Sequence, residues 1–374
     1  MRRWFGWVAL VGLVACKKDV ADVDTSPEED PLTTTTETLS TANGVATVSI
    51  EVTEGIRSFF ISGRSDKNAM VERVRNPDGD TVLDWQDWYG SNESLSQGVL
   101  PTFTHYVDFN WPVRAEDGPL AEGTWEVDLS LYSDNGYGTS GDIETTIQTL
   151  KDTDLDQGEV EVRIVYADGL DDDEEVVEAV ETAVERWRDI WAEVDIELKD
   201  SFDSSDFDTT PGYIGQGDDE ELLDLSAEGN DRDLTLIIVE DIGGDGYLFG
   251  QAGGIPGPLI EGANAAVAVS WLAHSGTDLE FDDDEMRLFG DTMAHEIGHY
   301  MGLFHPVEDG GNGTWQYFDA LADTPQCSSW NSCENQLADN MMFPYPICSW
   351  TECAPQDDIT DDQSGVLHRY SGTR

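Results

Sequence analysis

Positively charged side chains are scarce in this chain of 374 residues. Nineteen lysines and arginines stand against 78 aspartates and glutamates, which gives a formal net charge of -59. Such an acidic surface repels phosphate backbones and anionic lipid headgroups, so the composition argues against a nucleic-acid-binding protein. Two interpretations of the acidity stay open: a surface that keeps an exported protein soluble, and a preference for basic polypeptides as partners.

The apolar run at the N-terminus is short. From Trp4 to Ala15 it has twelve residues and follows two arginines, which is too short to cross a bilayer but suits a signal peptide. The run ends in Leu-Val-Ala-Cys at Cys16, which resembles the lipobox of bacterial lipoproteins. This resemblance implies removal of residues 1–15, lipid on Cys16, and anchoring to a bacterial membrane at the cell surface or periplasmic face. An ordinary signal peptide with an incidental cysteine is the alternative.

Cysteine is rarer still, with five in the chain. After Cys16, the other four lie within one span of 27 residues, at Cys327, Cys333, Cys348 and Cys353. In an exported chain, an even number of clustered cysteines predicts two disulfides, with three possible pairings. A four-cysteine zinc site is the competing interpretation, although no Cys-x-x-Cys pair is present.

The residues after the leader divide into segments of different pattern. Residues 16–42 are polar, threonine-rich and acidic, which predicts a disordered tether. Residues 43–150 contain short alternating runs separated by turns, such as 45–52 and 124–132, which predict an all-β, sandwich-like domain. This domain could be an accessory domain or a prosegment that blocks a cleft until it is removed.

Residues 155–374 change to a mixed pattern of strands and helices. Apolar runs predict strands over 159–167, 194–198, 233–240 and 265–272, and helical spacing predicts helices over 171–191 and 284–301. This order is typical of an α/β domain with a twisted, mostly parallel sheet. The glycine-rich stretch 243–258 has no phosphate-binding pattern, and we expect it to be a surface loop lining a cleft.

Histidine is nearly as rare as cysteine, and its distribution is uneven. Three of the six histidines lie within HEIGHYMGLFH, residues 295–305. His295 and His299 are four residues apart, which places both imidazoles on one helix face with Cβ atoms about 5–6 Å apart. Gly302 permits a sharp turn, so that His305 can fold back beside them.

Three neutral imidazoles and one open position describe a catalytic zinc site. Glu296 follows the first histidine and can reach a water molecule at the open position, where zinc lowers the pKa of that water. The glutamate would accept the water's proton and pass it to the leaving amine. The alternative is a histidine-rich helix end that binds no metal.

The motif H-E-x-x-H-x-x-G-x-x-H resembles that of the metzincin metallopeptidases. Met342, in the sequence DNMMF, matches the methionine turn of that family. Among metzincins, the chain most resembles the pappalysins, because it contains DALADTP at 319–325, cysteines on both sides of the turn, and ITDDQ at 359–363. The resemblance covers residues 155–374, and residues 43–150 resemble the small sandwich domains of many secreted bacterial peptidases.

The resemblance implies an endopeptidase that cleaves extracellular proteins, with zinc held by His295, His299 and His305 and with Glu296 as the base. It also implies crossed disulfides, Cys327 to Cys348 and Cys333 to Cys353. Calcium is expected near the acidic segment, at Asp319 and Asp323.

A departure from the family concerns the tyrosine near the zinc. Relatives place it two residues after the turn methionine, where this chain has Pro344. Tyr345 follows directly and is the candidate oxyanion stabiliser. A different class of function, a catalytically inactive lipoprotein that binds a partner at the cell surface, is the alternative; the presence of Glu296 and of every ligand favours the enzyme.

Overall fold

The computed structural model describes residues 31–41, 43–152, 155–205, 234–244, 246–276, 279–311, 314–349 and 353–374. The expected signal peptide, Cys16 and the first part of the expected tether lie outside these ranges. Within them, no helix combines the length and the apolar character needed to cross a membrane.

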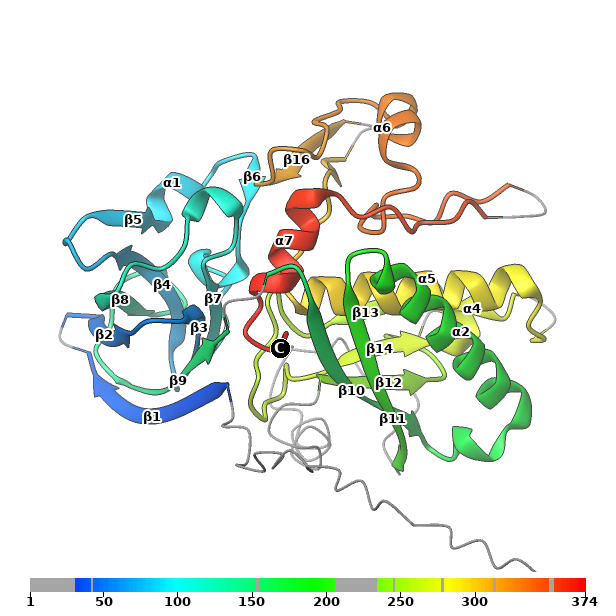
Figure 1. Ribbon diagram of the computed structural model, residues 1–374, viewed down its shortest axis with the longest axis horizontal. Helices are drawn as coiled ribbons and strands as arrows, with labels where there is room; N and C mark the ends of the chain where they lie inside the picture. The colour runs from blue at the N-terminus through cyan, green and yellow to red at the C-terminus, as the bar shows by residue number, and fades with distance from the viewer. Residues whose placement is uncertain are drawn as a thin grey trace, which may run out of the picture. The chain divides into compact units, whose positions relative to one another are not determined.

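Two antiparallel sheets occupy the N-terminal part of the described chain (Figure 1). The first has the order β1 (Leu32–Ser40), β9 (Asp142–Lys151), β3 (Ile56–Arg64), β7 (Tyr106–Trp111). The second has the order β2 (Val45–Val52), β8 (Gly123–Tyr132), β4 (Asn68–Arg75), β5 (Thr81–Asp84). Short elements connect them: α1 (Trp85–Trp88), β6 (Glu93–Ser94), and 3-10 turns at Gln97–Val99 and Ala115–Asp117.

Alternation along the strands explains how the two sheets bury apolar surface. In β2, Val48, Ile50 and Val52 are buried while the residues between them are exposed, as expected for a strand with one face on a core. The rings of Phe59 in β3 and Trp125 in β8 are 6.1 Å apart, so side chains of the two sheets meet in one core. The sequence pattern over 43–150 therefore predicted strands correctly, whereas its status as a separate domain stays a prediction.

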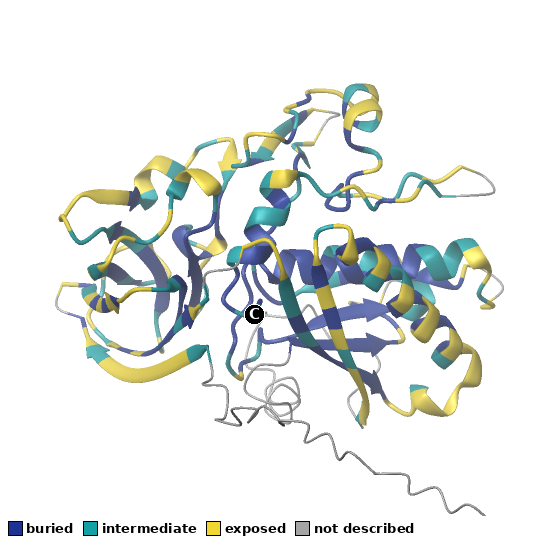
Figure 2. Cartoon of the chain, in the orientation of Figure 1, coloured by how far each residue is buried: buried dark blue, intermediate teal, exposed yellow. Residues whose placement is uncertain are grey.

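Strand β1 corrects the expectation of a disordered tether. Residues 32–40 pair with β9 along their whole length, from Leu32 opposite Leu150 to Ser40 opposite Asp142. Most of the strand is exposed (Figure 2). Its sequence has few of the apolar residues from which a folded segment is predicted. Its threonines are β-branched and suit a pleated strand, and backbone pairing to an existing sheet edge needs no core of its own.

The C-terminal part contains the expected, mostly parallel sheet. Its order is β11 (Ile196–Ser205), β10 (Gly158–Ala167), β12 (Leu234–Val239), β14 (Val267–Ser270), β13 (Gly250–Ala252). Neighbouring strands are parallel except for β13, which runs antiparallel to β14 at the edge. Strands β12 and β14 are buried at every position, because packing covers both of their faces.

Helices α2 (Glu174–Ala192) and α5 (Asp283–Tyr300) cover one face of this sheet (Figure 1). Side chains such as Ile164, Leu236 and Val269 share a core with both helices, whereas Val165 and Ile237 belong to a cluster on the opposite face. The two helices approach closely, since a Cβ atom on Gly290 would lie 2.5 Å from the carbonyl oxygen of Ala183. The remaining helices among the described residues are the 3-10 turn Leu170–Asp172, α4 (Trp271–His274), α6 (Trp330–Leu337) and α7 (Asp361–Arg369).

The N-terminal sheets and the C-terminal part pack together as one unit, Pro31–Arg374. The rings of Phe60 and Tyr370 meet at 5.9 Å, and the hydroxyls of Ser58 and Ser371 are 2.9 Å apart. Buried Arg57 donates to the carbonyl oxygen of Thr373 at 2.5 Å. Buried contacts thus connect the residues on the two sides of the expected domain boundary between residues 150 and 155. That boundary stays a prediction.

A small sheet also joins the two parts. Its order is β15 (Glu308–Asp309), β16 (Trp315–Asp319), β6, so that a strand from residues 93–94 pairs with a hairpin that follows the histidine motif. Phe318 donates its N–H to the Asn92 carbonyl at 2.7 Å, and Ala320 donates to Ser94 at 3.1 Å.

The disulfide pairing differs from the expected one. Two disulfides are present, as predicted, but they join Cys327 to Cys333 and Cys348 to Cys353, so the crossed pairing is wrong. They also leave no thiolates among these four residues for the alternative zinc site. Each disulfide joins cysteines that are close in sequence, with separations of 6 and 5 residues. A local turn is enough to bring each pair together.

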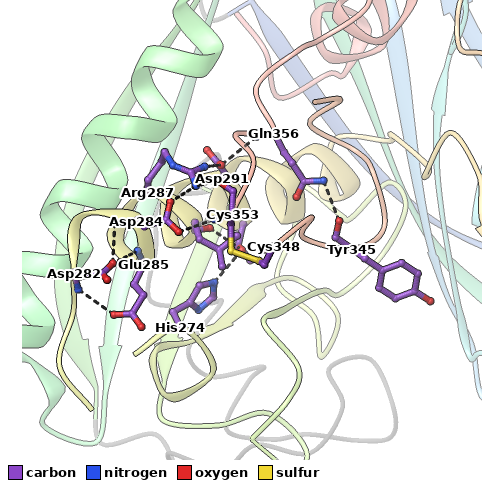
Figure 3. The surroundings of a disulfide bond; sticks show 12 residues. His274, Asp282, Asp284, Glu285, Arg287, Asp291, Tyr345, Cys348, Cys353 and Gln356 are labelled. Carbon is purple, nitrogen blue, oxygen red and sulfur yellow. Dashed lines mark hydrogen bonds and ion pairs between the residues drawn. A yellow bond between two sulfur atoms is a disulfide. The ribbon is translucent and has the colours of Figure 1, made fainter. Parts of the chain in front are cut away.

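The second disulfide lies against helix α5 (Figure 3). The Cys353 N–H donates to Asp284 at 2.7 Å, and Arg287 donates to the Cys353 carbonyl at 2.6 Å. Nearby, the Gln356 N–H donates to Asp291 at 3.2 Å. These contacts fasten the disulfide loop to the helix that carries the first two histidines.

Candidate metal centre

Helix α5 begins and ends at residues suited to those positions. Asp282 caps its N-terminus in a capping box with Glu285, and both reciprocal hydrogen bonds are present. Buried Phe289, Met293 and Ile297 follow the spacing of one helix face. The helix ends at Tyr300, and Gly302, two residues later, has a φ of 114°, so the chain turns sharply and His305 returns toward the helix.

The three histidines of the motif meet at their Nε2 atoms. The Nε2 of His305 lies 3.1 Å from that of His295 and 3.0 Å from that of His299. Zinc binds imidazole nitrogen at about 2.0–2.1 Å in a tetrahedron, which separates two ligand nitrogens by roughly 3.3 Å. Among the described residues, this is the only group of three or more His, Cys, Asp or Glu side chains with metal-binding geometry.

Hydrogen bonds at the other ring nitrogens fix the tautomers. The Nδ1 of His295 lies 2.7 Å from the Met341 carbonyl oxygen, and that of His299 lies 2.6 Å from the Leu303 carbonyl. The Nδ1 of His305 lies 2.6 Å from Oε1 of Glu308. Because each partner can only accept, every Nδ1 carries the proton and every Nε2 presents a lone pair. Three converging lone pairs repel one another unless a cation lies between them, so the residues fit a zinc ion.

Burial keeps two of these rings neutral, the form that binds metals. It lowers the pKa of His295 to about 3, with the neighbouring His305 adding to the effect. Burial also lowers the pKa of His299 well below its usual value. A ring that stays unprotonated near neutral pH keeps its Nε2 lone pair available to a metal.

Glu296 is a buried carboxylate packed against the edge strand β13. Its exposed fraction is 8%, and burial raises its pKa to about 8, against an opposing hydrogen bond from the Ala252 backbone. A Cβ atom on Gly250 would lie 2.4 Å from Cγ of Glu296, so a glycine is needed where the strand passes the carboxylate. The stretch 243–258 was expected to be a surface loop lining a cleft, but it contains the edge strand β13, and Gly250 and Ala252 of that strand contact the candidate base.

The methionine turn lies beneath the centre of the histidine motif. Met342 is fully buried, and a Cβ atom on Gly298 would be 2.9 Å from its sulfur and 3.1 Å from Cε of Met341. The turn is held by Asn340, whose side chain exchanges two hydrogen bonds with Gln363 and accepts the Met342 N–H at 3.0 Å. The turn thus contacts both the histidine helix, through Gly298, and the segment that contains Gln363.

The chain is similar to several proteins named extracellular metalloproteases. It is 25% identical over 169 residues to one from Colletotrichum graminicola, covering 43% of this chain and 56% of that protein. It is 27% identical over 116 residues to one from Coccidioides posadasii, covering 31% and 39%. A third, from Arthroderma benhamiae, is 37% identical over 71 residues, covering 16% and 24%. The chain thus spans about half, or less, of the length of these relatives.

These similarities support a metallopeptidase. No protein-family model matches the chain. Among solved structures, metalloproteinase-II from Bacteroides fragilis aligns with a TM-score of 0.30 and 14% identity, over 59% of this chain and 55% of that one. Archaemetzincin from Methanopyrus kandleri aligns with a TM-score of 0.26 and 16% identity, over 56% and 88%.

Tyr345 lies in a group of aromatic side chains. Its ring packs near those of Trp315 and Trp330, at 6.1 and 6.4 Å, and the residue is 45% exposed. Burial of the hydroxyl and the nearby carboxylates of Asp309 and Glu308 raise its pKa. Its role as an oxyanion stabiliser stays a prediction.

The structure gives no support to the expected calcium ion. Asp319 accepts hydrogen bonds from the Thr324 hydroxyl and the Leu321 N–H. Asp323 accepts from the Thr360 hydroxyl and the Asp362 N–H, both at 2.8 Å. Asp323 therefore uses both oxygens to accept from neighbouring protein groups, whereas Asp319 accepts on Oδ1 and its buried Oδ2 has no hydrogen-bond partner among the described residues.

Sequence reasoning missed two features of the centre. Glu308 was not recognised as the partner of His305, although it follows that ligand by three residues and a carboxylate at this distance is a sufficient signal. The contact of Gly250 with Glu296 could not be found, since it depends on the edge strand crossing the helix.

Proposed function

We propose that this chain is a zinc endopeptidase of the metzincin class, similar to pappalysins, that cleaves exported proteins. The observation that carries the proposal is the convergence of three Nε2 lone pairs, with that of His305 at 3.0–3.1 Å from the other two and each ring fixed by an acceptor at Nδ1. The buried Glu296 directly follows the first of these ligands on the same helix. The similarity to extracellular metalloproteases supports the same class.

The residues divide the chemistry between them. His295, His299 and His305 would hold zinc, which when bound supplies a Lewis acid that polarises the scissile carbonyl and acidifies water. Glu296 takes the proton of the attacking water on its carboxylate and later donates it to the leaving amine. Burial raises the pKa of this carboxyl to about 8, so its ionised form is a stronger base than an exposed glutamate, and its protonated form can return the proton to the leaving amine.

The location of the protein is also a proposal. The apolar leader and the sequence ending at Cys16 support export followed by lipid attachment to a bacterial membrane. Labelling of growing cells with radioactive palmitate should mark the wild type and leave Cys16→Ser unlabelled. Equal labelling of both would rule out this anchor.

We further propose that the N-terminal sheets are an accessory part of the active protein, not a removable prosegment. The buried contacts of Arg57 and Ser58 with Thr373 and Ser371 support this, because removing the sheets would leave those polar groups and apolar surface exposed. N-terminal sequencing of the active protein from cells should begin before residue 43. A start near residue 150 would show that the sheets are a prosegment.

The decisive experiment measures cleavage of unfolded casein. We expect cleavage by the full chain, loss of cleavage with a zinc chelator, and recovery when zinc is restored. Glu296→Gln should cleave at least about 100-fold more slowly, the lower range for loss of a general base, while still binding zinc. Glu185→Gln, at an exposed position on α2, is the matched control and should retain the wild-type rate.

Two outcomes would contradict parts of this proposal. An unchanged rate in Glu296→Gln would remove the assigned base. Zinc binding by the wild type without cleavage of any protein substrate would instead favour the inactive binding lipoprotein.

A further inference from the structure

The third ligand is held differently from the other two. His295 and His299 lie on α5, and their Nδ1 atoms meet backbone carbonyls. His305 lies beyond the helix end, and its Nδ1 meets the carboxylate of Glu308 at 2.6 Å. A loop residue has more freedom than a helical one, so His305 depends more on the group that fixes its ring.

Glu308 is itself held by the small sheet. It belongs to β15 and lies opposite Tyr317 of β16, while Phe318 of β16 lies opposite Glu93 of β6. Next to it, Val307 is fully buried in a cluster with Trp315. Asp309 accepts the Gly311 N–H at 2.8 Å, and Gly311 has a φ of 82°, which closes the turn of the hairpin. The backbone that carries Glu308 is thus fixed on both sides.

We propose that Glu308 is a positioning residue of the metal centre, which fixes the ring of His305 and strengthens its binding to zinc. This inference rests on the metal site of the proposed function. A carboxylate that accepts from Nδ1 orients the imidazole and makes its Nε2 a better electron donor, whereas a carbonyl supplies the orientation with less charge. The side chain of Glu308 is 47% exposed, so solvent moderates the effect of its charge.

The experiment measures the zinc affinity of the full chain by competition with a chromophoric chelator. Glu308→Ala should weaken zinc binding by about 10-fold to 100-fold, the usual cost of removing an outer-shell partner. Glu308→Gln should lose less, because its amide oxygen still accepts from Nδ1. Asp309→Asn is the matched control, since it removes the same charge from the adjacent residue and keeps the acceptor for Gly311; its affinity should match the wild type.

Unfolding by urea without zinc separates positioning from a merely structural role. We expect Glu308→Ala and the wild type to be equally stable in that state and to differ only when zinc is present. Equal zinc affinity in Glu308→Ala and wild type, or equal losses in Glu308→Ala and Asp309→Asn, would overturn the inference while leaving the proposed function intact. If Glu308→Ala does not fold, an unchanged affinity in both Glu308→Gln and Asp309→Asn overturns it. Failure of the wild type to bind zinc, or unchanged binding in His305→Ala, would overturn the metal site and the inference together.

Discussion

Glu296 lies against a backbone segment that leaves no space for a side chain. Because a Cβ atom at position 250 would be 2.4 Å from Cγ of Glu296 and 2.8 Å from Oε1, Gly250→Ala must displace either the carboxylate or β13. A displacement of about 1 Å in a catalytic group can cost about 100-fold in rate. We expect casein cleavage by Gly250→Ala to fall by about this factor, with zinc affinity unchanged because the three atoms nearest the added Cβ all belong to Glu296 and none to a zinc ligand.

Gly138→Ala is the control for that prediction. A Cβ atom there would meet the Asn43 carbonyl oxygen at 3.5 Å, an ordinary contact far from the histidines in sequence. Its cleavage rate should equal that of the wild type. A rate for Gly250→Ala that also equals the wild type would show that the edge strand adjusts without moving Glu296.

His274 makes the stability of the fold depend on pH. Its ring is buried between Phe249 and Phe289, and its nitrogens bond to the Ser270 carbonyl at 2.5 Å and the Thr292 hydroxyl at 2.9 Å. Burial lowers its pKa from 6.5 to about 4. Between these values the unfolded chain binds a proton that the folded chain does not, so stability is present above pH 6.5 and falls as the pH falls toward 4.

We expect the free energy of unfolding in urea to fall by about 3 kcal/mol more in the wild type than in His274→Asn over this window. Titration of other groups is common to both proteins and cancels in the difference. Parallel pH profiles for the two proteins would show that His274 does not carry the effect.

Helix α5 depends on its first turn as well as on its core-facing side chains. Asp282 accepts the N–H groups of Asp284 and Glu285, both at 2.9 Å. Asp282→Ala removes these bonds and should lower the free energy of unfolding in urea by about 1 kcal/mol. Asp283→Ala, one position later and outside the cap, should cost clearly less; equal losses would mean that charge near the helix end, not capping, is responsible.

Local patterns predicted some of the elements and missed others for physical reasons. The four-residue spacing of Phe289, Met293 and Ile297 predicted α5 to within one residue at each end. Apolar residues at this spacing form one face of a helix that packs on the core. Strand β1 was missed because a mostly exposed edge strand has no apolar face to detect. The pairing of Cys348 with Cys353 was also missed, since spacing alone does not say which cysteines a turn brings together.

The candidate site was predictable where one element carries it and not where distant segments meet. The convergence of His295, His299 and His305 followed from helix periodicity and a glycine stop. The carboxylate three residues after His305 was a local signal that was overlooked. The contact of Gly250 with Glu296 required knowledge of the edge strand, which no spacing within the motif contains. Likewise, the alternating pattern over 43–150 predicted strands but not their buried contacts with the C-terminal residues.

Zinc should stabilise the molecule as a whole, because its ligands come from α5 and from the segment beyond it. A ligand at about 1,000 times its dissociation constant adds about 4 kcal/mol to the free energy of unfolding. We expect chelation to lower the thermal unfolding temperature of the wild type and of Glu296→Gln, which keeps every ligand. His305→Ala should respond little to zinc or chelator, and a wild-type response in that variant would contradict the assigned ligand set.

The pairing of residues 93–94 with the hairpin behind His305 has a consequence for how such proteins change over evolution. Glu93 lies opposite Phe318, and Glu308 lies opposite Tyr317. A substitution at one position alters the fit of the residue opposite it, so positions 93 and 318, and positions 308 and 317, should covary among homologous sequences. A chimera that joins this catalytic region to the N-terminal sheets of a distant homologue would then inherit a poorly matched support for its third histidine. We therefore expect the N-terminal sheets and the catalytic region to be inherited and transferred between genomes together.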